Sequence, residues 1–314
     1  MFLEKHSRFF RRYRFTIRPR AKSAPALPLV AAPTEYSVKD ALEKAIRNKK
    51  AEAVQPNGDR VEIVATQHDQ AKGLLTLLLH RTSPTAADPS YRKRVKDKIQ
   101  VRHGTKDQDE DQAVSAHLTI RTKASAPFTY DFVLEEIPGL SMSVIRPIFG
   151  ILLRDYEFPY LDKKGEEQAT YSTVRADGVK SEGLDSALKK KSSLSYITLV
   201  RTNIPDAPDS DGLAEPQTEK IKYKIVGDIN TKDRREKLNN FITRARKADW
   251  DDIYIEINLD DDRHRTVKLD REEEASEILF VRSEQVAVSV ELKPCSHDVL
   301  DEIVSCCEKI LSKP

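Results

Sequence analysis

The stretch AEAVQPNGDRVEIVATQ, residues 51–67, indicates the fold class of this chain. Short runs rich in Ala, Val and Ile flank Asn57-Gly58, a pair that supplies the positive φ of a tight hairpin turn. The stretch therefore predicts an antiparallel β-hairpin.

Similar strand patterns extend over much of the chain. In RRYRFTIR, residues 11–18, the apolar side chains of Tyr13, Phe15 and Ile17 alternate with polar ones, so one face of the strand can enter a core. Further strands are expected at residues 74–80, 114–121, 128–134, 171–174, 194–204, 221–226, 253–259, 266–269, 278–281 and 286–292. Helices are expected after Ser37 and over residues 141–156, 184–191, 231–247 and 296–311. The pattern predicts an α+β protein of two domains, with mixed, mainly antiparallel sheets and packed helices.

Changes in composition along the chain indicate where the domains begin and end. Residues 1–33 are expected to form a basic N-terminal strand and an Ala/Pro linker, and residues 34–202 an α+β domain. Residues 203–219 are acidic, rich in Pro and without periodicity, which is typical of a long surface loop or boundary. Residues 220–314 are then expected to form a smaller α+β domain.

The composition favours a folded protein in a reducing compartment. The 314 residues are 39% hydrophobic and 33% charged, with 53 Lys and Arg against 51 Asp and Glu. The only cysteines are Cys295, Cys306 and Cys307, without a CxxC spacing, so neither a disulfide framework nor a zinc knuckle is expected. No apolar stretch approaches the roughly 20 residues that cross a bilayer. We therefore expect a cytoplasmic protein.

Positive charge is concentrated in three segments of the sequence. The first 22 residues carry eight Lys or Arg and one Glu, and the other two segments are residues 91–103 and the helix expected at 231–247. The residues expected to contact phosphates are Arg11, Arg12, Arg14, Arg92, Lys93, Arg94, Lys96, Lys232, Arg234, Arg235, Lys237, Arg244, Arg246 and Lys247. If these converge on one surface, they neutralise several phosphates with little sequence preference. The leading prediction is thus a non-enzymatic protein that binds double-stranded DNA, with no cofactor and no metal ion.

Two spacings favour a phosphodiester-cleaving enzyme as an alternative. His117 and Thr119 form an H-x-T triplet that resembles half of the 2H phosphodiesterase signature, a resemblance that implies acid–base chemistry by the histidine and phosphate binding by the threonine. Glu291 and Lys293 have the E-x-K spacing of restriction-type nucleases, whose carboxylates hold Mg²⁺. The second carboxylate would come from Asp260, Asp261, Asp262 or Asp270.

Several other enzyme classes are excluded because the sequence lacks their motifs, and a binding role without a motif stays open. No P-loop, no G-x-G-x-x-G turn and no G-x-S-x-G elbow occurs in the sequence. A protein–protein adaptor remains a third hypothesis, with residues 206–219 and the apolar helix at 141–156 as docking surfaces. Self-association also stays open.

A set of features in the middle and at the end of the chain resembles the A component of the Rex exclusion system of lambdoid prophages and, more loosely, other bacterial anti-phage accessory proteins. These features are a buried strand followed by a loop rich in Thr, Pro and Asp (residues 74–89), a Gly-Thr-Lys-Asp turn (104–107), the strand that contains His117, and a closing strand-strand-helix unit. The resemblance implies a DNA-binding protein that senses phage replication intermediates and signals to a membrane partner.

Overall fold

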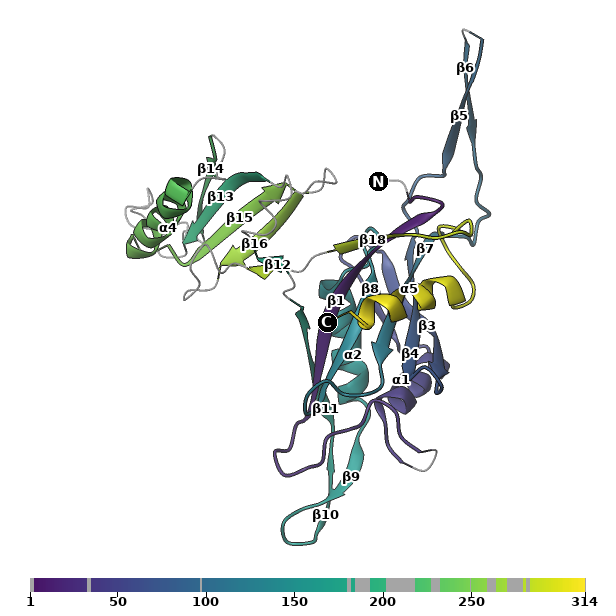
Figure 1. Ribbon diagram of the computed structural model, residues 1–314. Helices are drawn as coiled ribbons and strands as arrows, with labels where there is room; N and C mark the ends of the chain where they lie inside the picture. Colours follow the sequence, from purple (N-terminus) through teal and green to yellow (C-terminus); the bar gives the residue numbers. More distant parts are fainter. Residues whose placement is uncertain are drawn as a thin grey trace, which may run out of the picture. The chain divides into compact units, whose positions relative to one another are not determined.

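The computed structural model describes residues 3–32, 35–96, 98–179, 182–183, 193–201, 218–226, 232–248, 250–258, 264–269, 279–280 and 283–313. The chain divides into two compact units (Figure 1). Met1–Val179 and Ser283–Pro314 form the first unit, and Lys180–Arg282 the second. Antiparallel strands predominate and helices are few, so the protein is richer in β-structure than a balanced α+β protein.

An eight-stranded sheet forms the centre of the first unit. All its neighbouring strands are antiparallel, in the order β11-β1-β8-β7-β4-β3-β2, and β18 also pairs with β1. The strands are β1 (Ser7–Pro19), β2 (Glu52–Val54), β3 (Arg60–Asp69), β4 (Leu74–Ser83), β7 (Gln112–Arg121), β8 (Thr129–Glu135), β11 (Ser172–Gly178) and β18 (Ser283–Ala287). The hairpin expected around Asn57-Gly58 is confirmed: Ala53 pairs with Val61, and Gly58 has φ +87°.

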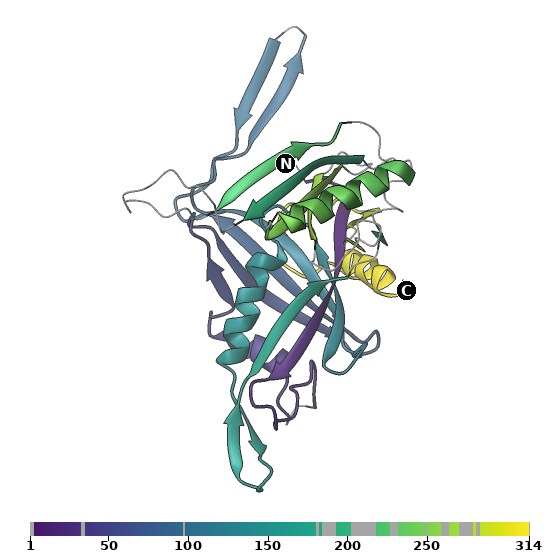
Figure 2. The ribbon, with the colours of Figure 1, turned by 90° about the vertical axis from the view of Figure 1, so that its left-hand side faces the viewer.

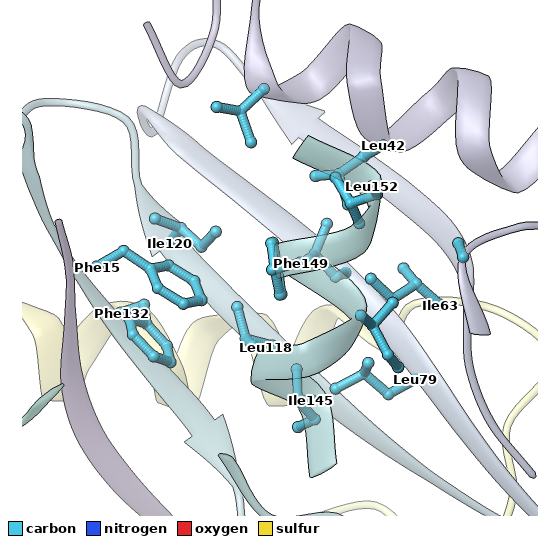
Figure 3. Close-up of a cluster of buried hydrophobic side chains, with 14 of the residues drawn as sticks. Phe15, Leu42, Ile63, Leu79, Leu118, Ile120, Phe132, Ile145, Phe149 and Leu152 are labelled. Atoms are coloured by element: carbon cyan, nitrogen blue, oxygen red, sulfur yellow. The ribbon is translucent and has the colours of Figure 1, made fainter. Parts of the chain in front are cut away.

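Helices cover both faces of this sheet. Helix α1 (Val38–Arg47) begins at Ser37, whose hydroxyl accepts a hydrogen bond from the N–H of Asp40. Together with α2 (Met142–Arg154), α1 packs over one face, where alternate strand residues form the main core (Figure 3). Helix α5 (Asp301–Leu311) covers the opposite face, on which Phe10, Leu74 and Val133 meet its apolar side chains. Adjacent strand residues therefore belong to two different cores.

Two smaller hairpins also belong to the first unit. They consist of β5 (Ser90–Val95) with β6 (Lys98–His103), and of β9 (Phe158–Leu161) with β10 (Glu167–Thr170).

The second unit contains a four-stranded antiparallel sheet in the order β14-β13-β15-β16. Its strands are β13 (Ser193–Arg201), β14 (Glu219–Lys224), β15 (Asp252–Asn258) and β16 (His264–Leu269), and β12 (Glu182–Gly183) pairs separately with β17 (Leu279–Phe280). Helix α4 (Lys232–Lys247) packs on one face of the sheet (Figure 1), where Leu238 and Ile242 contact apolar strand residues.

The bounds of the two units differ from the domains expected from the sequence. Strand β1 is an internal strand of the large sheet rather than part of a separate N-terminal segment. The C-terminal residues 283–313 return to the first unit, because β18 pairs with β1 and α5 packs on β7 and β8. The helix expected at 184–191 and most of the loop expected at 203–219 lie outside the described residues. Within the described ranges, no helix has the length and apolar character that crossing a bilayer requires.

Candidate nucleic-acid interface

Strands β5 and β6 form a two-stranded ribbon that we call the arm, residues 90–103 (Figures 1 and 2). The arm is inserted between β4 and β7, which pair with each other up to Ser83 and Gln112. Every described residue of the arm is exposed, and among the described elements β5 and β6 make extensive contacts only with each other. The arm is therefore accessible on both of its faces.

The register of the arm places cations on both faces. Lys93 is opposite Gln100, and Arg102 is opposite Tyr91, with its guanidinium 4.9 Å from the ring centroid. On the other face, Arg92 pairs with Val101, and Arg94 is opposite Ile99. The chain reverses after Val95 at Lys96, which has φ +53°.

The positive charge of the arm is not neutralised within the described part of the chain. The arm's cationic residues are Arg92, Lys93, Arg94, Lys96, Lys98 and Arg102, and none of them forms an ion pair with a described carboxylate. Its one acidic residue, Asp97, lies outside the described residues. The side chains of Tyr91, Ile99 and Val101 are more than half exposed, at 54%, 55% and 55%. The arm thus combines exposed positive charge with exposed apolar surface.

The arginines of β1 have a different environment from those of the arm. Arg11 donates a hydrogen bond to Glu136, and the Nε of Arg14 is 3.0 Å from a carboxylate oxygen of Asp131. Arg12 also has an interaction partner. Because β1 is an internal strand of the sheet, the ion pairs of Arg11 and Arg14 join it to neighbouring segments of the fold. Arg11 and Arg14 therefore contribute less free positive charge than the sequence indicates.

The third cationic segment, α4, belongs to the second unit. Lys237, Arg244 and Lys247 are exposed and Arg246 is half-buried. The side chains of Lys232, Arg234 and Arg235 lie outside the described residues. The three segments expected to converge are therefore divided between the units, with β1 and the arm in the first and α4 in the second.

His117 is buried in a hydrogen-bond network rather than facing a pocket. It is 1% exposed, its Nδ1 is 2.7 Å from Glu135 Oε2, and its Nε2 accepts the N–H of Leu300 at 3.1 Å. The Thr119 hydroxyl is 3.2 Å from that of Thr76 on β4. Both ring nitrogens of His117 and the hydroxyl of Thr119 thus take part in hydrogen bonds within the protein. These bonds indicate a structural role for the two residues.

Glu291 and Lys293 do not gather with other potential metal ligands. Glu291 pairs with Lys5 at 2.8 Å, and this contact lowers the pKa of the exposed carboxyl. Lys293 is exposed, and its backbone carbonyl accepts a hydrogen bond from Arg8. Asp260, Asp261, Asp262 and Asp270 lie outside the described residues. In the part of the chain that is described, no three His, Cys, Asp or Glu side chains are grouped as metal ligands.

The sequence pattern predicts the positive charge of the arm but not its secondary structure. The apolar residues Val95, Ile99 and Val101 are too sparse to distinguish a helix from a strand, because a ribbon exposed on both faces needs no buried stripe. The contact residues expected from the sequence do not include Tyr91, Lys98 and Arg102. The alternation of Ile99 and Val101 with polar residues in 98–103 is the one local signal for this strand pair.

No protein-family model, curated protein or solved structure matches this chain.

Proposed function

We propose that this protein binds double-stranded DNA without cleaving it and with little sequence preference, and that the arm makes the main contact. The observation that carries this proposal is the group of arm cations on a ribbon open on both faces, none of which forms an ion pair with a described carboxylate. Such charges are costly to hold close together unless a polyanion neutralises them. Phosphates supply that neutralisation, and the release of condensed counterions adds to the affinity.

The dimensions of the arm fit a DNA groove. A strand rises about 3.4 Å per residue, so strands of six residues span about 20 Å. The major groove is about 12 Å wide and admits a two-stranded ribbon. Cations on the two faces then approach the phosphates on both sides of the groove. Ile99 and Val101 offer apolar contacts, which suit thymine methyl groups.

The cellular role that we propose is in bacterial phage exclusion, with the protein in the cytoplasm. It rests on the resemblance to the A component of the Rex system, which also implies a membrane protein as the partner that receives the signal. The free thiols of Cys295, Cys306 and Cys307 fit a reducing compartment. The H-x-T enzymatic alternative has less support, because its histidine is fully occupied by hydrogen bonds. The adaptor alternative has less support, because most of the apolar side chains of α2 are buried in the main core.

The test compares two double variants with the same change in net charge. Arg92→Glu/Arg94→Glu alters the arm, and Lys163→Glu/Lys164→Glu alters the exposed turn between β9 and β10. Binding of a fluorescent duplex is measured by anisotropy as salt is raised. We expect the arm variant to lose most of its affinity at low salt and to reduce the slope of log K against log salt by about 2.

The control variant should keep a nearly unchanged slope. Equal losses in the two variants would show that only net charge matters, and an absence of duplex binding at low salt would overturn the proposal. Incubation of the wild-type protein with duplex and Mg²⁺ tests the non-enzymatic part, which cleavage of the DNA would reject.

A further inference from the structure

We propose that the sheet of the second unit has a separate binding site for single-stranded nucleic acid, on the face opposite α4. This site is independent of the arm and takes a different ligand. Its features are aromatic side chains on the two central strands and a row of lysines on the edge strand β14.

The strand register places these side chains on one face. Tyr196 on β13 pairs directly with Lys224 of β14, and Thr198 pairs with both Lys222 and Tyr254. Residues that are directly opposite each other in a ladder point to the same side of the sheet, as do residues two apart along a strand. The face therefore carries two tyrosines, with Lys220, Lys222 and Lys224 along its edge.

The two faces of this sheet are chemically different. The α4 side is apolar: Ile197, Leu199 and Ile255 are buried there, and the ring of Tyr223 makes an edge contact with Phe241 of α4 at 5.2 Å. The apolar cluster of the second unit takes none of its described members from the opposite face. That face is polar and aromatic, so it is built to contact a ligand with both π-surfaces and charge.

Tyr196 is already in contact with a cation on this face. The Nζ of Lys222 lies 4.1 Å from the centre of the Tyr196 ring and 2.8 Å from a carboxylate oxygen of Glu256. Lys220 and Lys224, on either side of it, are exposed. Successive lysines are two residues apart, roughly 7 Å along the strand. Because Glu256 already pairs with Lys222, the positive charge of this lysine track comes mainly from Lys220 and Lys224, beside an aromatic ring.

This combination fits an unpaired strand better than a duplex. Bases that are not paired can stack flat on aromatic rings, whereas a duplex keeps its base faces inside. A sheet with aromatic residues on its central strands presents rings in the arrangement that single-strand binding sheets use. The lysine track then neutralises the backbone phosphates that run beside the stacked bases.

The experiment uses the full-length protein and labelled oligonucleotides of thymidine and of uridine, which distinguish DNA from RNA. Tyr196→Leu removes the stacking surface and should weaken binding of at least one single strand by about tenfold. Tyr196→Phe keeps the ring and should bind as the wild type does. Tyr223→Leu removes a tyrosine from the opposite face and should leave single-strand affinity unchanged.

A second variant keeps the proposal testable if Tyr196→Leu unfolds. Lys220→Gln/Lys224→Gln changes two exposed lysines and should lower single-strand affinity and its salt dependence. Since edge lysines also oppose pairing between sheets, the oligomeric state is checked in parallel. Unchanged affinity in both face variants, or an equal loss in Tyr223→Leu, would overturn the proposal. If arm variants weaken duplex binding but leave single-strand affinity unchanged, this site is independent of the arm.

Discussion

Glu135 accepts hydrogen bonds from both the backbone N–H and the ring Nδ1 of His117, at 3.0 and 2.7 Å. Its other carboxylate oxygen accepts the Nε–H of Arg8 at 2.9 Å. Because the Leu300 N–H donates to Nε2 of His117, the proton of the neutral ring is on Nδ1. The network joins β1, β7, β8 and the start of α5, so it holds together segments from both ends of the chain.

Removing His117 should therefore destabilise the fold. His117→Ala removes the ring N–H that donates to Glu135 and leaves the Leu300 N–H without its acceptor in a buried site, and we expect a loss of about 3 kcal/mol in the free energy of unfolding. Urea denaturation measures this loss. His103→Ala, on the exposed arm, is the matched control and should change stability by less than about 0.5 kcal/mol. Equal stability of the two variants would contradict the structural role of His117.

The arm should be removable without loss of the fold. The hydrogen bonds of the described residues in 84–111 stay within that segment or reach only Ser83, and Ser83 already pairs with Gln112. Replacing residues 84–111 by Asn-Gly should give a short hairpin between β4 and β7. We expect the melting temperature to change by less than about 2 °C while duplex binding falls to the background level. Retained duplex affinity would show that other residues bind DNA.

Asp59 should make stability depend on acid pH. Hydrogen bonds from Ser83 and Arg81 hold the pKa of this buried carboxyl below its ordinary value of 3.8. A carboxyl with a lowered pKa in the folded state adds stability above its unfolded pKa, and that stability is lost as pH falls through the folded pKa. Asp59→Asn should thus cost about 2 kcal/mol at pH 7, and the difference from wild type should shrink below about pH 4.

Unfolding by urea at several pH values tests this prediction. Asp109→Asn, in an exposed loop, is the control and should show no such pH dependence. A constant difference between wild type and Asp59→Asn from pH 7 to pH 3 would refute it.

Gly139 should tolerate no side chain. It has φ +80°, and a Cβ atom built there would lie 1.9 Å from a guanidinium nitrogen of Arg81. That guanidinium also donates to the Pro138 carbonyl at 2.9 Å, so it cannot move without losing this bond. Gly139→Ala should destabilise the protein by about 1–3 kcal/mol in thermal unfolding. Gly150→Ala is the control, because no atom lies near that position and the helix gains a better helix former.

The three thiols should differ in reactivity. Burial raises the pKa of the Cys307 thiol, and both Cys306 and Cys307 of α5 are buried in the apolar cluster between this helix and the sheet. Cys295 is only half-buried. Iodoacetamide at pH 8 should modify Cys295 alone in the native protein and all three cysteines in denaturant, as counted by mass spectrometry. Labelling of the native Cys295→Ser variant would contradict this assignment.

Local pattern determined much of the secondary structure. Asn57-Gly58 specifies its own turn, and the alternation in residues 11–18 and 114–121 reports directly that each strand has two different faces. The cationic segments were equally visible, since charge is a property of composition. Neither signal contains information about distant partners.

Tertiary structure alone decided which charges remain free. Arg14 is paired with Asp131, 117 residues away, whereas Arg92 and Arg94 project from a ribbon with no described carboxylate bonded to them. It also decided that β1 lies between β8 and β11, and that α5 returns to cover the second face. The physical reason is that a sequence pattern reflects burial of each residue, while ion pairing and sheet order depend on which elements pack together across the whole chain.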